Sequence, residues 1–318
     1  MFAVKRFGSL PRTASKLVRF CPTTFALAVV LVVANQTAGH AQTVVPPAGP
    51  ICSVAGTTAT CTGGLSAGVD ANGPTITTLN VNNLTQNLGN TGAADSINFA
   101  TTDTDATLVL DLGGFQGLNT ASPGDVVDVS VFDTGNVSIT STGDLTTSGF
   151  GGGIVGSVDG LGNGGVTVVS QGNISTQNFG INAFTVNAGD VSIQSTGNVT
   201  VNNPLTGLPG LFSQPSGIIA GVQNIGNIVI NSNGNVTVTG LGLNSGIRAN
   251  SFVGAAITDV TIESNGDINV SGGTFNNIGI NAGTVTGNLS ITSTGNIVAD
   301  TGILSFNDFA GAGSSTIV

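Results

Sequence analysis

Residues 190–198 read Asp-Val-Ser-Ile-Gln-Ser-Thr-Gly-Asn, and this stretch decides the fold. Six copies of the pattern occur, each with two alternating apolar residues, a Ser two positions later, and a Gly followed by Asn or Asp. The copies begin at Asn136, Gly165, Asp190, Asn227, Asp259 and Asn288. The first and last residues of a copy are always eight apart, whereas successive copies begin 25 to 37 residues apart. A constant core with variable spacers predicts a stacked structural repeat.

Within each copy the pattern predicts a strand, a corner and a second strand. Val191 and Ile193 share one face of an extended chain, because side chains alternate between the two faces. Gly197 and Asn198 are the residue types that best tolerate left-handed backbone angles, so they predict a bend. Apolar alternation then resumes at Val199.

Two polar columns follow from stacking the copies. Ser195 has the same parity as the apolar residues, so we expect it to point inward, near the corner. The inward serines are Ser141, Ser170, Ser195, Ser232, Ser264 and Ser293. The corner residues are Asp144, Asn173, Asn198, Asn235, Asp267 and Asn296. We expect both columns to be structural ladders that satisfy their hydrogen bonds from one repeat to the next.

A third strand follows each corner and starts with Gly-Ile. The isoleucines are Ile154, Ile181, Ile218, Ile247, Ile280 and Ile303. The residue after the isoleucine varies in character, which predicts that each Ile faces inward and its neighbour faces solvent. Three strands in each repeat, without a helical pattern between them, predict an all-β protein that forms a parallel β-helix (solenoid). Each coil would stack on the next at about 4.8 Å.

The chain divides into four segments. Residues 1–41 are expected to be a secretory signal, because a basic stretch precedes a short apolar run and Gly-His-Ala. A retained membrane anchor is the alternative. Residues 42–74 read as a linker and N-terminal cap, and 75–134 as irregular early coils. Residues 135–318 form the regular array, which stops partway through a coil, so we expect a truncated piece of a longer surface protein.

Cys52 and Cys61 are the only cysteines after the signal segment. In an exported protein such a close pair predicts a disulfide. A zinc site is the weaker alternative, since two thiols without a nearby His leave it incomplete. We expect the bond to staple the exposed first edge of the stack.

Charge excludes several partners. Five of the six basic residues and the single His lie in residues 1–41, so the exported chain carries a formal charge of 1 − 16 = −15. Nucleic acid is excluded, because phosphate binding needs a basic footprint.

No catalytic residues, cofactor or metal site are expected. The Gly-rich stretch 149–165 resembles a calcium-binding repeat only weakly.

Two features are candidate contacts. Arg248 is the one cation outside the signal segment, and it faces outward. A salt bridge to Asp267 or Glu263 and a ligand contact are its alternative roles. The loop Thr200–Ser216 is apolar and Pro-rich, and it is either a contact site or a cover for its own coils. The close pairs Asp103/Asp105 and Asp125/Asp128 are expected to be solvated turn residues.

The repeats, the Gly-Ile-x-Ala strands and the Cys52–Cys61 loop resemble the passenger domains of bacterial autotransporters. The resemblance covers residues 135–305 and the cysteine loop. It implies a right-handed, single-chain β-helix that is displayed on the cell surface at the outer membrane, or released from it. Such domains often act in adhesion. It also implies an outer-membrane translocator barrel as the partner in the full-length parent, and this chain has no barrel sequence.

Two function classes follow. The first is an exported structural or adhesive surface module, with a host or cell-surface ligand and with self-association through the last coil. Expressed alone, it would remain in the periplasm. The second is a carbohydrate-active β-helix enzyme, a lyase or hydrolase. The absence of Trp and Tyr and the single Glu263 argue against the enzyme.

Overall fold

A computed structural model describes residues 52–65, 68–72, 75–86, 88, 95–112, 118–120, 124–160, 162–204, 214–251, 258–273, 276–307 and 313–318. The signal segment and the Pro-rich linker before Ile51 lie outside these residues. In the described part of the chain, no helix has the length and apolarity needed to cross a membrane.

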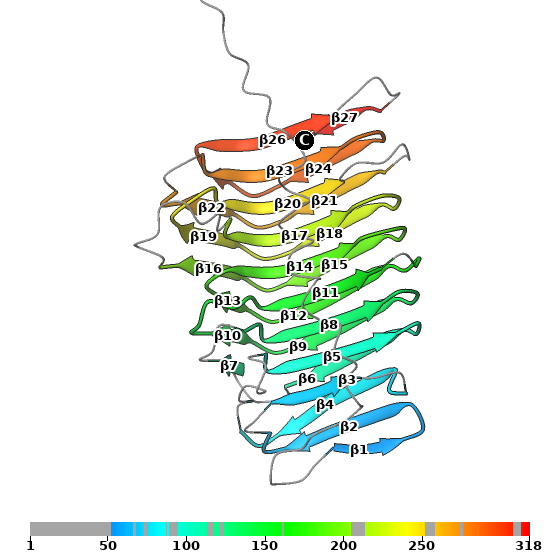
Figure 1. Ribbon diagram of the computed structural model, residues 1–318. Helices are drawn as coiled ribbons and strands as arrows, with labels where there is room; N and C mark the ends of the chain where they lie inside the picture. The colour runs from blue at the N-terminus through cyan, green and yellow to red at the C-terminus, as the bar shows by residue number, and fades with distance from the viewer. Residues whose placement is uncertain are drawn as a thin grey trace, which may run out of the picture. The chain divides into compact units, whose positions relative to one another are not determined.

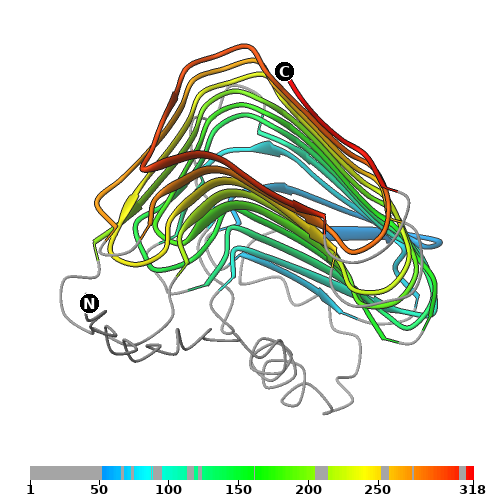
Figure 2. The same cartoon turned by 90° about the horizontal axis from the view of Figure 1, so that it is seen from above.

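Strands stack into three parallel sheets, which form the sides of a solenoid (Figure 1; Figure 2). Sheet A has eleven strands: β1 (Cys52–Ala55), β2 (Thr58–Gly63), β4 (Thr78–Leu84), β6 (Ala106–Asp111), β9 (Val137–Thr142), β12 (Val166–Gln171), β15 (Val191–Thr196), β18 (Ile228–Ser232), β21 (Val260–Ser264), β24 (Leu289–Ser293) and β27 (Ser315–Ile317). Sheet B has nine: β3 (Val69–Asn72), β5 (Ile97–Thr102), β8 (Val127–Phe132), β11 (Ile154–Asp159), β14 (Phe179–Thr185), β17 (Ser216–Val222), β20 (Ser245–Ser251), β23 (Ile278–Thr284) and β26 (Thr301–Asn307). Sheet C has seven: β7 (Leu118–Thr120), β10 (Leu145–Thr147), β13 (Ile174–Thr176), β16 (Val199–Asn203), β19 (Val236–Gly240), β22 (Ile268–Ser271) and β25 (Ile297–Val298).

The register of the sheets follows the sequence repeat. In sheet A, Val191 pairs with Val166 on one side and Ile228 on the other, so equivalent residues of successive copies lie above one another. In sheet C, Val199 pairs in the same way with Ile174 and Val236. Three strands per coil and the all-β parallel solenoid are therefore confirmed.

The core is the column of inward side chains from the three sheets. Val191, Ile193 and Val199 are fully buried, as are their partners in neighbouring coils. Burying one such side chain contributes roughly 1.5–3 kcal/mol, so seven or so layers of them dominate the stability. The predicted early coils continue the same core, since β4 and β6 lie in sheet A and β5 and β8 lie in sheet B.

The third strand of each coil lies in sheet B, and its isoleucines face inward as predicted. Ile181, Ile218, Ile247 and Ile280 are all 0% exposed. The prediction that the following residue is exposed was wrong. Asn182, Ile219, Arg248 and Asn281 are half-buried, and Val155 is buried. Parity holds, but a residue in the middle of a stacked sheet is shielded by its neighbours in the coils above and below.

The inward serines stack as predicted but do not form a hydrogen-bonded ladder. Ser195 pairs in register with Ser170 and Ser232. The hydroxyl oxygens of Ser141, Ser195, Ser232, Ser264 and Ser293 are buried without a hydrogen-bond partner. Equivalent atoms of adjacent strands lie about 4.8 Å apart, which exceeds hydrogen-bond distance.

Removing one of these hydroxyls should therefore stabilise the fold or leave it unchanged. We expect Ser195→Ala to change the free energy of unfolding by less than about 1 kcal/mol or to raise it, because it deletes a buried group with no partner. Urea denaturation of the two proteins measures this. A loss of about 2 kcal/mol or more would mean that the hydroxyl is bonded.

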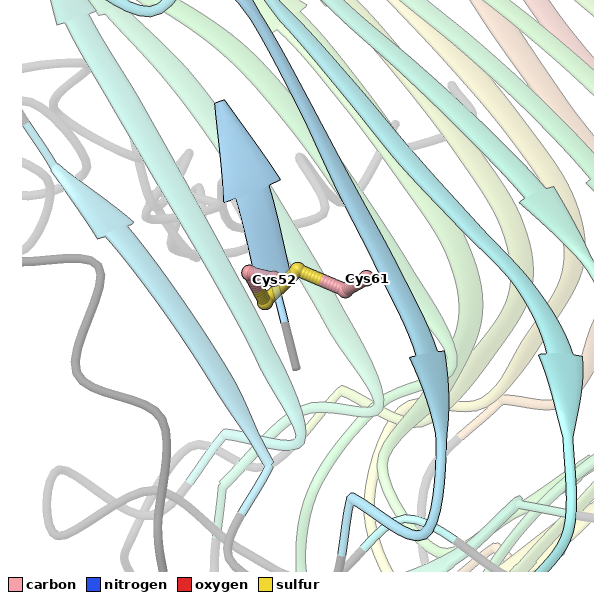
Figure 3. Close-up of a disulfide and its surroundings, with 2 residues drawn as sticks. All are labelled: Cys52 and Cys61. Atoms are coloured by element: carbon pink, nitrogen blue, oxygen red, sulfur yellow. A yellow bond between two sulfur atoms is a disulfide. The ribbon is translucent and has the colours of Figure 1, made fainter. Parts of the chain in front are cut away.

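The first strand of sheet A closes the N-terminal end of that sheet. β1 is antiparallel to β2, and Cys52 lies opposite Cys61 with their Cα atoms 4.0 Å apart. The two residues form a disulfide (Figure 3). Strand β1 thus pairs with the edge of β2, which would otherwise present unpaired backbone groups.

Reduction of this disulfide should loosen the first coils before the later ones. β1 has only β2 as a neighbour in its sheet, whereas central strands pair on both sides. We expect faster amide hydrogen exchange in β1 and β2 after reduction, with little change in β15 and β18. Equal acceleration along the whole array would contradict this.

Candidate functional site

The predicted corner residues bond from coil to coil, through the backbone of the next coil. In each step, Oδ1 of one residue accepts a hydrogen bond from the backbone N–H of the next, at 2.7–3.0 Å. The series runs through Asp144, Asn173, Asn198, Asn235, Asp267 and Asn296. We call it the corner ladder. It fixes the turn from sheet A to sheet C.

A second ladder precedes sheet A, and sequence reasoning assigned it no role. Here too the side-chain oxygen accepts from the backbone N–H of the next coil, at 2.7–3.3 Å. The entry ladder, as we call it, consists of Asp105, Asn136, Gly165, Asp190, Asn227, Asp259, Asn288 and Ser314. The sequence contains a signal for this ladder, because five of the six copies of the repeat start with Asn or Asp.

The entry ladder is interrupted at Gly165. The N–H of Gly165 donates to Oδ1 of Asn136 at 2.9 Å, but Gly165 has no side chain to continue the ladder to Asp190. An open hollow of about 490 Å³ lies at this point of the surface. Ser138, Thr167 and Ser192, on the outer face of sheet A, line it together with these ladder residues.

Four aspartates gather on sheet B and at its edge, in neighbouring coils. We call Asp95, Asp125, Asp128 and Asp159 the acidic cluster. Oδ1 of Asp95 accepts from the N–H of Asp125 at 2.8 Å, and Oδ1 of Asp125 accepts from the N–H of Gly152 at 2.6 Å. Asp128 lies on the outer side of β8, in register with Asn98.

Burial and mutual repulsion raise the pKa of these carboxyls. Burial raises the pKa of Asp128 to about 8, and repulsion from the other three aspartates of the cluster adds to it. Burial likewise raises the pKa of Asp125 to about 6, although the hydrogen bond from Gly152 opposes the change. The pKa values of Asp95 and Asp159 are also raised, chiefly by burial.

The expectation that Asp125 and Asp128 are solvated turn residues was therefore wrong. Both side chains are half-buried, and Asp128 is in a strand rather than a turn. The spacing of Asp125 and Asp128 could not show that they belong to a larger cluster. Asp95 and Asp159 come from other coils, and each is at least 30 residues away along the chain from both Asp125 and Asp128.

Stability should fall as the pH rises through the range set by Asp128. The carboxyl takes up its proton more tightly in the folded state, with a pKa of about 8 against an ordinary value of 3.8. The folded state thus holds more protons between about pH 4 and pH 8, so its stability decreases over that interval.

Asp128→Asn should remove most of this dependence. We expect the free energy of unfolding to rise by on the order of 2 kcal/mol at pH 8.5 and to change little at pH 4. A full shift would give ~1.4 kcal/mol per pKa unit, but the expected gain is smaller because water screens part of the side chain. Urea denaturation at both pH values measures the effect. Asp111→Asn, which removes an exposed charge on β6, is the control, and an equal gain in both variants would contradict the assignment.

No metal centre is formed by the described residues, since nowhere do three or more His, Cys, Asp or Glu side chains gather closely enough to hold an ion. This includes the acidic cluster and residues 149–165 so far as they are described.

Arg248 lies on the outer side of β20, half-buried. Its Nη1 donates a hydrogen bond to Oε1 of Gln214, a residue of the predicted contact loop Thr200–Ser216. The end of this loop is therefore held against sheet B, whereas residues 205–213 lie outside the described residues. Asp267, one expected salt-bridge partner, accepts from the N–H of Asn296 in the corner ladder.

Comparison of the chain with protein-family models, curated proteins and solved structures finds no match. The fold nevertheless defines a class, since the chain is a parallel β-solenoid protein of about seven turns.

Proposed function

We propose that the chain is an exported, non-catalytic surface module that acts in adhesion, in the manner of an autotransporter passenger domain. The observation that carries the proposal is the outer face of sheet A. Along it, small uncharged polar residues occupy the same position in five of the six copies, namely Ser138, Thr167, Ser192, Thr261 and Ser290, and Val229 is the exception.

The ladders support this function because they stiffen the array. Hydrogen bonds from coil to coil on both sides of sheet A, interrupted only between Gly165 and Asp190 among the described ladder residues, hold the outward side chains at a regular spacing. A rigid surface loses little conformational freedom when it binds. The expected partners are a cell-surface ligand and, in the full-length parent, an outer-membrane translocator barrel.

Adhesion by the purified chain tests the proposal. Beads coated with the exported chain should be retained on a panel of bacterial and host cells, and the combined variant Thr167→Glu, Ser192→Glu and Thr261→Glu should reduce retention about ten-fold through added charge. Three glutamates on the outer side of sheet B, at Asn182, Ile219 and Asn281, provide the control. Absence of retention on every surface, or equal retention by both variants, would refute adhesion through sheet A.

The acidic cluster favours a carbohydrate-active enzyme as the second candidate. A carboxyl with a pKa of about 6 or 8, as in Asp125 and Asp128, can hold a proton near neutral pH, which a general acid requires. Release of reducing or unsaturated ends from a panel of polysaccharides measures the activity. Turnover that disappears in Asp125→Asn and Asp128→Asn would establish the enzyme and displace the adhesive proposal.

A further inference from the structure

We propose that the gap in the entry ladder at Gly165 is a binding site for the acetamido group of an N-acetylated saccharide. This inference deepens the proposed adhesive function, on whose ligand it rests, by naming a chemical class and a place.

The gap leaves a hydrogen-bond donor without a partner. At the other steps of the entry ladder the backbone N–H donates to the side-chain oxygen of the preceding coil, as the Asn227 N–H does to Oδ1 of Asp190 at 2.7 Å. Gly165 provides no such oxygen, and among the described residues nothing else accepts from the N–H of Asp190. A bound oxygen atom could satisfy this donor.

An acceptor faces the same space from the other side. A Cβ placed on Gly165 would lie 2.9 Å from the carbonyl oxygen of Asp190, 3.6 Å from the backbone nitrogen of Asp190 and 3.8 Å from Oδ1 of Asn136. Oδ1 of Asn136 already accepts from the N–H of Gly165, but a carbonyl oxygen can accept twice. A group that fills the gap thus meets one donor and two acceptor oxygens, of which the carbonyl oxygen of Asp190 already accepts from the N–H of Val166.

Intact steps of the ladder show which group fits between them. Where the ladder residue is Asn, its oxygen accepts from the next coil, and its Nδ2 can donate to the preceding carboxylate. Nδ2 of Asn136 donates to Oδ1 of Asp105 at 3.1 Å, and Nδ2 of Asn288 donates to Oδ1 of Asp259 at 3.2 Å. An amide is therefore the complementary group, with its C=O toward Asp190 and its N–H toward Asn136.

The surroundings favour an amide carried by a sugar. The hollow of about 490 Å³ is larger than one carboxamide and has room for a sugar ring. Ser138, Thr167 and Ser192 line it from three successive coils, and their side chains carry hydroxyls that can bond the hydroxyls of a sugar ring. Ala188 also lines the hollow and offers an apolar contact for the acetyl methyl group.

Chito-oligosaccharide titration, followed by amide resonances of the full exported chain, tests the proposal. We expect saturable shifts of the Asp190 and Gly165 resonances. The matched cello-oligosaccharide, which has a hydroxyl in place of the acetamido group, should bind about ten-fold more weakly. An asparagine-containing peptide, which carries a carboxamide without a sugar, should also bind more weakly.

Gly165→Asn supplies the missing carboxamide from the chain itself and should abolish the shifts. Thr239→Asn adds a carboxamide at an exposed position of β19 in sheet C, outside the hollow, and should leave binding unchanged. Equal binding of both oligosaccharides, tighter binding of the peptide, or unchanged binding by Gly165→Asn would overturn the inference. So would the absence of shifts in the wild-type chain, which needs no variant to fold. Cell adhesion that persists without these shifts would retain the adhesive function and reject this site alone.

Discussion

Replacing Gly217 by alanine is expected to lower the free energy of unfolding by about 3 kcal/mol. A Cβ at this position would lie 2.3 Å from Cγ1 of Val236 and 2.6 Å from the carbonyl oxygen of Gly246. Val236 is fully buried in sheet C, and Gly246 belongs to the backbone of the next coil. Neither can yield without disturbing the stack on both sides. Urea denaturation followed by far-ultraviolet circular dichroism measures the loss.

Gly302 provides a matched control, because it occupies the equivalent place in the last described coil. An added Cβ there would meet no atom within 4 Å. Gly302→Ala should therefore change the stability by less than about 0.5 kcal/mol. Equal losses in the two variants would mean that backbone conformation, and not close approach between coils, requires glycine at the start of the third strand.

Asn277→Asp is expected to cost about 3 kcal/mol at neutral pH. Asn277 is 6% exposed at the corner between sheets C and B. Its Oδ1 accepts from Nδ2 of Asn244 at 3.0 Å and from the N–H of Gly273 at 3.1 Å, and its Nδ2 donates to Oδ2 of Asp300 at 2.8 Å. Aspartate would keep the accepted bonds but replace the donor by a second carboxylate facing Asp300.

The loss should shrink as the pH is lowered toward about 4, because protonation of the introduced carboxyl restores a donor and removes the repulsion. Denaturation midpoints at pH 4.5 and 7.5 measure this. Asn269→Asp, on the exposed side of β22, adds the same charge at a solvated position and should cost less than about 0.5 kcal/mol. A pH-independent loss at Asn277 would contradict the carboxylate contact.

The hydrogen bonds around Asn277 could not be predicted from the sequence, although their residues share a place in the repeat. Asn244, Asn277 and Asp300 each lie two residues before the Gly of a Gly-Ile strand. Only the stacking of the coils shows that their side chains bond to one another. The acidic cluster escaped prediction because Asp95, Asp125 and Asp159 come from three coils, and the early, irregular sequence does not reveal the relative register of those coils.

The repeat by itself determined which residues face inward, where each coil turns and how many strands a coil has. Period-two alternation fixes side-chain direction, and the Gly-Asn or Gly-Asp pair fixes the bend, so Val191, Ile193 and Ile218 were placed correctly. Only the tertiary structure decided how polar groups are satisfied. Stacking holds equivalent atoms one strand spacing apart, which is too far for Ser195 to bond its neighbours, whereas an Asn or Asp side chain is long enough to reach the backbone of the next coil. The gap at Gly165 depends on that same spacing, because Asn136 and Asp190, which face the gap, belong to the coils on either side of Gly165.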